Sequence, residues 1–318
     1  MRTALRVFLP FALGYTVSYL VRVINAVAGE PIARDLDLSA GELGLLTSLF
    51  FAGFGLAQIP LGILMDRFGP RRVEAATLLL LAAGAGLFAI ATSFVDLAIG
   101  RLFMGVGASM CLMAPLTAYR RWFAERRLPL VNGVHLAFGA MGGALGGGPT
   151  DALILSLGWQ PVFALLGLAT LAMSAAIFFV VPAEREPTGR PRLVALSREI
   201  RTVATSAAFW KIAPLSAASQ AALLSIPSLW TGPWLRQVAD LPSQVAATWL
   251  SVYALSLIVG FVGTGWLMNR ARSAAVAERV VLAGAGLFVA VQLAIALLPP
   301  AAGAARCPPD LSRRAPGR

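Results

Sequence analysis

The chain alternates between long apolar runs and short polar clusters that are rich in arginine. An apolar run of about 20 residues can cross a bilayer as a helix, because each helical residue rises about 1.5 Å. Nine such runs cover residues 5–28, 40–61, 73–92, 97–118, 131–155, 161–181, 209–230, 245–268 and 279–298. The pattern therefore predicts an all-α polytopic membrane protein that is embedded in, and has as a partner, the lipid bilayer.

The composition supports this reading. Hydrophobic residues make up 58% of the chain and charged residues only 13%, whereas a soluble domain carries about 25% charged residues. The net charge of +11 could also indicate nucleic-acid binding. The basic residues, however, form short clusters between apolar runs, without a basic face that carries exposed aromatic side chains. We therefore predict no nucleic-acid partner.

The distribution of basic residues predicts the orientation of the spans. With a cytoplasmic N-terminus, only Arg34 and Arg236 of the loop arginines before residue 298 lie in outer loops. Lysine and arginine accumulate on the cytoplasmic side of membrane proteins. The first outer loop is expected to carry Glu30, Arg34, Asp35 and Asp37. We expect a multi-pass, monomeric protein of a bacterial inner membrane.

Two short patterns recur at nearly the same separation. Residues 83–88 (AGAGLF) reappear at 283–288, and residues 62–67 (GILMDR) are echoed at 265–270 (GWLMNR). This repeat predicts two halves of similar orientation. The expected parts are a six-helix bundle over residues 1–182, a cytoplasmic linker over 183–208, a partial bundle of three helices over 209–298 and a tail over 299–318. Since three further spans would complete the second half, we expect a truncation or a change of reading frame after residue 298.

The loop between the second and third spans holds seven residues at fixed spacing: Gly62, Leu64, Asp66, Arg67, Gly69, Arg71 and Arg72. The pattern G-x-L-x-D-R-x-G-x-R-R resembles motif A of the major facilitator superfamily of transporters. The resemblance implies a conformational latch, in which the aspartate and the arginines hold the two helices at the cytoplasmic rim. The alternative is that the arginines only anchor the loop inside.

Two further sets of residues resemble motifs of the same superfamily. They are Arg101, Gly105 and Gly107 in the fourth span, and Gly139, Gly148 and Pro149 in the fifth. The first set resembles motif B, in which the arginine is associated with proton coupling. The second resembles part of motif C, which is reported for antiporters. Ala152 and Leu153 stand where motif C has a later glycine pair, so the glycines of this span are interpreted as a close-packing surface.

Polar side chains line one face of the first span, at helical spacing. They are Tyr15, Ser18, Tyr19, Arg22 and Asn25. An arginine inside a span costs about 2.5–3.5 kcal/mol, so it usually has a partner or a role. We expect Arg22 to face a substrate cavity. The alternative is that it lies near the outer end, where it reaches the headgroups or pairs with Glu30.

Further polar side chains within the predicted spans are candidates for lining the same cavity. The complete set of substrate candidates is Tyr15, Tyr19, Arg22, Asn25, Gln58, His135, Gln220 and Tyr253. His135 is the only histidine, and a lone histidine is more often a hydrogen-bonding residue between helices. The sequence shows no nucleophile paired with a base, no phosphate-binding loop and no metal-ligand cluster. We therefore predict no enzymatic activity, no cofactor and no metal.

The signs of the charges within the spans favour an anionic substrate. Arg22 and Arg101 lie within spans, whereas Glu42, Asp96 and Asp151 lie at helix ends, and no carboxylate is expected in the middle of a span. With the resemblance, this predicts a secondary transporter of a small organic or inorganic anion. It would work by alternating access, as a symporter or antiporter coupled to a proton or a counter-substrate. The alternatives are an exporter of neutral drugs or sugars and a truncated, non-transporting membrane protein.

Overall fold

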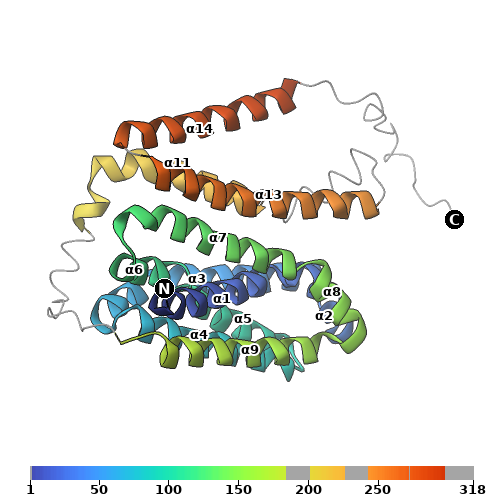
Figure 1. Cartoon of the computed structure of the whole chain (residues 1–318). Coiled ribbons are helices and arrows are strands. Elements are labelled where there is room, and N and C mark those ends of the chain that lie inside the picture. Colours follow the sequence, from blue (N-terminus) through green and yellow to red (C-terminus); the bar gives the residue numbers. More distant parts are fainter. Residues whose placement is uncertain (1, 184–200, 226–242, 272, 298–318) are drawn as a thin grey trace. The chain divides into compact units, whose positions relative to one another are not determined.

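The computed structural model describes residues 2–183, 201–225, 243–271 and 273–297 (Figure 1). It separates into one unit of Met1–Trp210 with Ala254–Arg270 and a second of Lys211–Tyr253 with Ala271–Arg318. The helices are α1 (Arg2–Val23), α2 (Asn25–Leu36), α3 (Ala40–Phe68), α4 (Pro70–Ala89), α5 (Phe94–Ala108), α6 (Met113–Trp122), the 3-10 turn η1 (Glu125–Arg127), α7 (Leu128–Leu145), α8 (Gly148–Leu157), α9 (Trp159–Val180), α11 (Ala207–Ser225), α13 (Ser243–Arg270) and α14 (Ala274–Leu297).

Six helical segments of the described chain are long and apolar enough to cross a membrane. They are Ala4–Val23, Ala40–Phe68, Pro70–Ala89, Phe94–Trp122, Glu125–Leu145 and Trp159–Val180. These segments coincide with the first six predicted spans, and α11, α13 and α14 coincide with the last three as far as those residues are described. The prediction of an all-α membrane fold is confirmed.

The helical chain at the first predicted span extends beyond residue 28 and is interrupted at Ile24. After Ile24 the chain continues as α2, and the Ile24 carbonyl accepts a hydrogen bond from the Ala28 N–H at 2.9 Å across the interruption. The helix persists because Ala28 and Ile32 bury an apolar side. Of the charged residues expected in an outer loop, Glu30, Arg34 and Asp35 lie on α2, and Asp37 ends it with a φ of 50°. The prediction of a loop at these residues is wrong.

Two other predicted spans are also interrupted. The fourth breaks between α5 and α6 over residues 109–112, and the fifth breaks at Gly146 and Gly147 between α7 and α8. Pro149 lies in the first turn of α8, where the missing N–H of proline costs no helical hydrogen bond. The Leu145 carbonyl at the end of α7 accepts a hydrogen bond from the Thr150 hydroxyl at 2.7 Å instead.

Specific residues fix where α3, α4 and α5 begin. Ser39 and Ser93 form capping boxes with the acids three residues later, Glu42 and Asp96. These hydrogen bonds satisfy backbone N–H groups that have no helical partner at the starts of α3 and α5. The turn between α3 and α4 is Gly69, whose φ of 79° strains any residue with a side chain. Pro70 then begins α4. The tight hairpin predicted between the second and third spans is therefore present.

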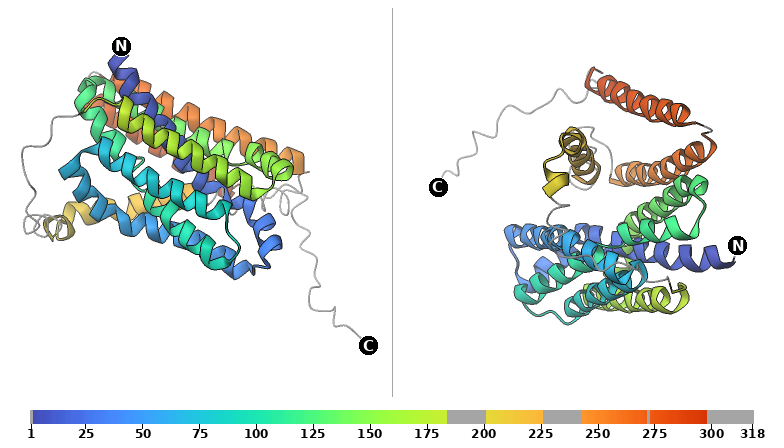
Figure 2. Two further views of the ribbon diagram at one scale, coloured as in Figure 1. Left: turned by 90° about the horizontal axis from the view of Figure 1, so that it is seen from below. Right: turned by 90° about the vertical axis from the view of Figure 1, so that its left-hand side faces the viewer.

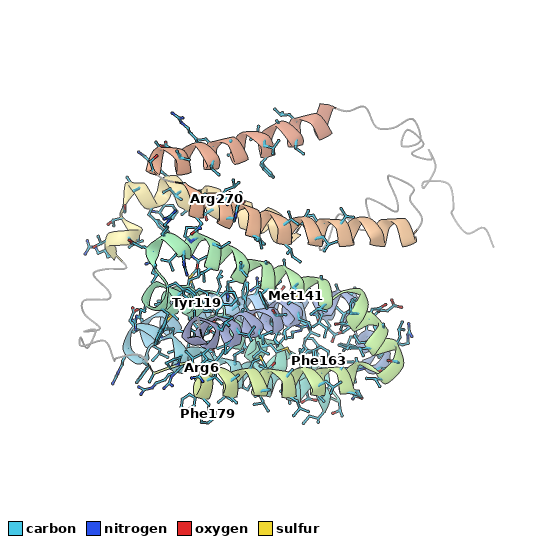
Figure 3. The ribbon with its side chains drawn as sticks, viewed as in Figure 1. Arg6, Tyr119, Met141, Phe163, Phe179 and Arg270 are labelled. Carbon is cyan, nitrogen blue, oxygen red and sulfur yellow. The ribbon has the colours of Figure 1, made fainter. Side chains whose placement is uncertain are left out.

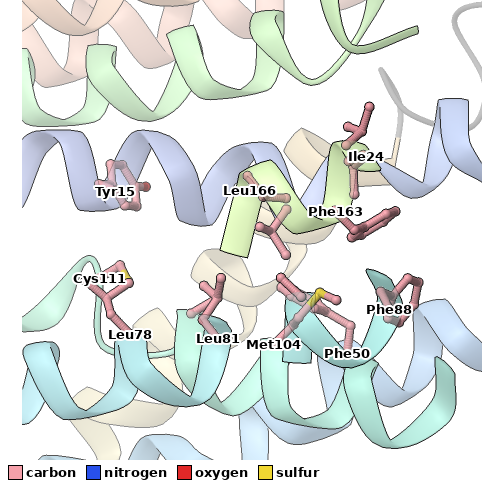
Figure 4. Close-up of a cluster of buried hydrophobic side chains, with 14 of the residues drawn as sticks. Tyr15, Ile24, Phe50, Leu78, Leu81, Phe88, Met104, Cys111, Phe163 and Leu166 are labelled. Carbon is pink, nitrogen blue, oxygen red and sulfur yellow. The ribbon is translucent and has the colours of Figure 1, made fainter. Parts of the chain in front are cut away.

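Helix α4 packs against α9 and α5, while α5 also packs on α3, and α1 packs on α7 and α9. Figure 2 shows the same helices from two further sides. Buried apolar side chains from these helices meet in one core (Figure 4). Within it, the rings of Phe88 on α4 and Phe163 on α9 lie 4.6 Å apart. The outer faces are apolar too: Phe179 is 80% exposed and points away from the bundle (Figure 3), as expected for a surface in contact with lipid.

Glycines on α5 let its backbone approach two neighbouring helices. A methyl group added at Gly107 would lie 2.5 Å from the Leu81 nitrogen of α4, and one at Gly105 would overlap the Phe50 carbonyl of α3. Small residues allow this approach, and close packing is a main source of helix association in lipid. The glycines of the motif B pattern therefore hold α3, α4 and α5 together.

The close approach of α5 to α3 predicts that Gly105→Ala destabilises the first unit. The added methyl group would overlap Phe50, and overpacking of this kind costs about 1–3 kcal/mol. Thermal unfolding of the purified protein would measure the loss. Gly55→Ala is the matched control, since no atom lies within 4 Å of the added group. Equal unfolding midpoints for the two variants would contradict the close approach.

Candidate functional site

The polar face of α1 points into the first unit. Tyr15 and Ser18 are buried, and Tyr19 and Arg22 are half-buried. The Tyr15 ring stacks on the His135 ring at 4.6 Å and meets the Tyr19 ring edge-on at 5.5 Å. One turn further along, the face ends on Arg22. Four substrate candidates thus lie in one continuous row, in the order His135, Tyr15, Tyr19 and Arg22.

Arg22 lies between two aromatic rings. Its guanidinium is 4.7 Å from the centre of the Tyr19 ring and 4.9 Å from that of the Phe54 ring on α3. Its Nε atom is buried and has no hydrogen-bond partner among the described residues. Glu30 forms its ion pair with Arg34, at 2.9 Å, so the alternative that Arg22 pairs with Glu30 is wrong. Aromatic faces attract a cation without neutralising its charge.

The other buried arginine, Arg101 on α5, joins three helices. It is 1% exposed, and its Nη1 donates to the Val21 carbonyl in the last turn of α1 at 3.2 Å. Carbonyls in a last helical turn lack partners within the helix. The guanidinium also lies 5.2 Å from the centre of the Phe88 ring on α4. The motif B arginine therefore fixes the end of α1.

Two polar candidates from other helices bind the backbone at the break between α5 and α6. The Gln58 side chain on α3 donates to the Ser109 carbonyl at 3.2 Å. Nε2 of His135 lies 3.4 Å from the Cys111 carbonyl, and Nδ1 lies 3.1 Å from the Tyr119 hydroxyl. Since a carbonyl only accepts, Nε2 carries a hydrogen and donates it to Cys111. The Tyr119 hydroxyl also lies 3.4 Å from the Phe8 carbonyl of α1. His135 is fully buried, which is the geometry of a hydrogen-bonding residue between helices.

The remaining substrate candidates lie apart from this row. Asn25 on α2 donates to the Thr47 hydroxyl of α3 at 3.1 Å. Tyr253 is half-buried in the second unit. Gln220 lies on α11, but its side chain is outside the described residues. The roles of these residues in substrate binding stay predictions.

The motif A residues divide between the turn and the surface. Arg71 donates to the Phe178 and Val181 carbonyls at the end of α9, at 3.2 and 3.1 Å. Asp66, Arg67 and Arg72 are exposed, and a methyl group added at Gly62 would meet no atom within 4 Å. Part of the motif therefore ties the α3–α4 turn to α9, while its acid remains on the surface.

The motif C-like residues lie along α7 and at the start of α8. A side chain at Gly139 would overlap the Tyr15 ring, and one at Gly142 would overlap the Thr16 carbonyl. Gly148 has open space around it, and Pro149 starts α8. The contacts of α7 with α1 agree with the packing interpretation of these glycines.

One buried acid was not expected from the sequence. Glu74 lies on α4, inside the span Pro70–Ala89, and is 0% exposed. Glu74 is the fifth residue of the 20-residue α4, so it is buried near the start of the span and not in its middle, where no carboxylate was expected. The predicted span began at residue 73, which placed Glu74 at a helix end, whereas α4 begins at Pro70 and packs this position against other helices. Tyr119 and Cys111 are also buried polar groups that the sequence pattern did not single out.

The site holds no recognisable metal ligands: across the described ranges, no three His, Cys, Asp or Glu side chains are grouped closely enough to hold an ion. What the structure offers instead is an apolar helical bundle with two buried or half-buried arginines and a few hydrogen-bonded polar side chains. This arrangement is that of a polytopic membrane protein.

The chain belongs to the Major Facilitator Superfamily, whose sequence pattern matches residues 11–306. It is similar to the probable sulfoacetate transporter SauU of Cupriavidus necator, with 27% identity over 52% of this chain and 39% of that protein. It is also similar to the multidrug resistance protein MdtL of Escherichia coli, with 29% identity over 58% of this chain and 49% of that protein. The chain therefore matches less than half the length of these relatives.

The fold is also similar to that of a solved transporter. The crystal structure of the Escherichia coli fucose:proton symporter FucP matches 83% of this chain and 72% of that chain, with a TM-score of 0.59 and 19% identity. At this identity the similarity concerns the fold, and it agrees with the helical arrangement of Figure 1.

The hydrogen bonds of Arg71 predict a structural role for this motif A residue. Arg71→Ala should lower the free energy of unfolding by about 1 kcal/mol, because two charge-assisted bonds to the end of α9 are lost at a half-exposed position. Chemical unfolding in detergent would measure this. Arg67→Ala is the control, since that exposed side chain contacts only the adjacent Phe68 ring at 5.0 Å in the described structure. A larger loss for Arg67→Ala would contradict the assignment.

Proposed function

We propose that the chain acts in secondary transport of small organic or inorganic anions across a bacterial inner membrane, by alternating access. The observation that carries the proposal is the environment of Arg22. Its charge lies between the Tyr19 and Phe54 rings, its Nε has no partner, and no described carboxylate pairs with it. A half-buried cation without a counter-ion is ready to bind an anionic group, for which arginine is well suited.

Two relatives point to different substrates. SauU is named for sulfoacetate, which is an anion, and MdtL is named for multidrug resistance. The unpaired charge of Arg22 favours the first class, since an exporter of neutral compounds would leave this charge without a counterpart. Proton or counter-substrate coupling would supply the driving force. An export role for neutral drugs or sugars is the second candidate, and binding measurements separate the two.

Binding of sulfoacetate and of a neutral sugar to the purified protein in nanodiscs tests the proposal. We expect sulfoacetate or another small organic anion to bind and the neutral sugar not to bind. Arg22→Ala should weaken anion binding by about tenfold to a hundredfold, since a hydrogen bond to a charged group contributes about 1.5–3 kcal/mol. Arg22→Lys should recover part of the affinity.

Arg34→Ala is the matched control, because this exposed arginine pairs with Glu30 on α2 and should not change anion affinity. Equal affinity for anionic and neutral ligands, or unchanged affinity in Arg22→Ala, would exclude the anion proposal. Counterflow in reconstituted vesicles then tests transport separately from binding.

The proposed orientation has its own test. We expect a cysteine at position 125, beside the arginines of the α6–α7 connection, to be cytoplasmic, and a cysteine at position 30 to be outside. In intact cells a membrane-impermeant maleimide should label Glu30→Cys and not Glu125→Cys. Both positions are exposed, and the native Cys111 is buried. The second native cysteine, Cys307, is replaced by serine in both variants. Labelling in the reverse pattern would invert the topology.

A further inference from the structure

Glu74 is a buried carboxyl group without a partner. It is fully enclosed by the first unit, and neither Oε1 nor Oε2 forms a hydrogen bond within the described residues. The proposed anion transport assigns no role to Glu74. Burying an ionised carboxylate without a partner costs several kcal/mol, and such residues in membrane spans are rare and mark functional sites.

The space for this carboxyl group is created by a glycine. A methyl group added at Gly14 on α1 would lie 3.3 Å from Oε1 of Glu74, 3.4 Å from Ile177 on α9 and 3.6 Å from Leu78 on α4. The carboxyl group therefore lies against the α1 backbone at Gly14, beside Ile177 of α9 and Leu78 of its own helix. A glycine inside a helix costs about 1 kcal/mol relative to alanine, and here it leaves the α1 backbone open to the acid.

The charged and titratable groups around Glu74 include no cation that neutralises it. Helix α9 has no titratable residue. On the segment that contains α5 and α6, the titratable groups that interact electrostatically with Glu74 are Cys111 and Tyr119. Tyr119 is in turn hydrogen-bonded to His135 of α7. On α1 the neighbour of Gly14 is Tyr15, which stacks on that same histidine.

The nearest arginines in the sequence, Arg71 and Arg72, precede Glu74 by three and two residues on α4, and neither forms an ion pair with it. Arg71 donates to the Phe178 and Val181 carbonyls of the α9 end instead. Arg101 contacts the Phe88 ring, which is 14 residues after Glu74 on α4 and so about 21 Å away along the helix. Asp66 and Arg67, at the end of α3, are exposed. Among the described residues Glu74 forms no ion pair. This site therefore accommodates the neutral acid rather than the carboxylate.

We propose that Glu74 is a proton-binding site, protonated in this conformation and deprotonated when a rearrangement of α1 against α4 and α9 admits water. The O–H bond of the acid breaks and the proton passes to water. Before the helices close again, the carboxylate takes up a proton from water, and the neutral acid is restored. The glycine contact at Gly14 and the break between α5 and α6 beside Cys111 provide the movable walls. The coupling role rests on the proposed transport function, whereas proton binding does not.

Infrared difference spectroscopy of the full chain in lipid nanodiscs tests proton binding directly. We expect the carbonyl-stretch band of a protonated carboxylic acid at neutral pH, and its loss when the pH is raised. The band should be absent from Glu74→Gln and retained in Glu125→Gln, in which an exposed glutamate is replaced. Glu74→Gln resembles the neutral acid in shape, so its unfolding midpoint should match that of the wild type. Absence of the band at neutral pH, or a band that never titrates while the protein stays folded, would overturn the proposal.

Transport assays test the coupling role. With an imposed proton gradient, Glu74→Gln should lose concentrative uptake of the anion while keeping exchange of labelled for unlabelled anion, and Glu74→Asp should restore part of the uptake. A residue with only a structural role would change uptake and exchange together, and this result would overturn coupling. If the wild type moves no anion but the infrared band titrates, the transport proposal fails and the proton site stands.

Discussion

Backbone carbonyls at helix ends and breaks bind several of the long polar side chains inside this bundle. Arg101 binds the last turn of α1, Arg71 binds the last turn of α9, and Gln58 and His135 bind the break between α5 and α6. In lipid a free carbonyl has no water to pair with, so it must find a donor within the protein. Each interruption of a helix thus creates the partner for a long polar side chain of a neighbour.

This constraint connects the superfamily motifs to the fold. Arg71 of motif A and Arg101 of motif B each bind a carbonyl of another helix, and the glycines beside Arg101 bring α5 close to α3 and α4. Arg22 and Glu74 differ from these two arginines, since neither binds a backbone carbonyl in the described chain. Groups outside the carbonyl network are the ones free to change partners during a conformational cycle.

The sequence was sufficient to predict the spans and the hairpin at Gly69, because both depend on local composition and on backbone conformation. It did not predict the interruptions near Ile24 and within residues 109–112, because an apolar run reads the same whether its helix is straight or broken. It also missed the burial of Glu74, which depends on Gly14 from another helix. The row from Tyr15 to Arg22 was visible as a helical stripe, but its contacts with His135 and Phe54 arise only in three dimensions.

Helix α3 contains 29 residues, which correspond to about 43 Å, whereas the hydrocarbon core of a bilayer is about 30 Å thick. A tilt of about 45° would be needed to bury the whole helix, and this exceeds the usual range of up to about 40°. Part of α3 must therefore project into the headgroup region. Asp66 and Arg67 occupy its last turn, so the thickness of the surrounding membrane determines how far these charges stand from the hydrocarbon. Hydrophobic mismatch with the lipid is thus a force that acts directly on motif A.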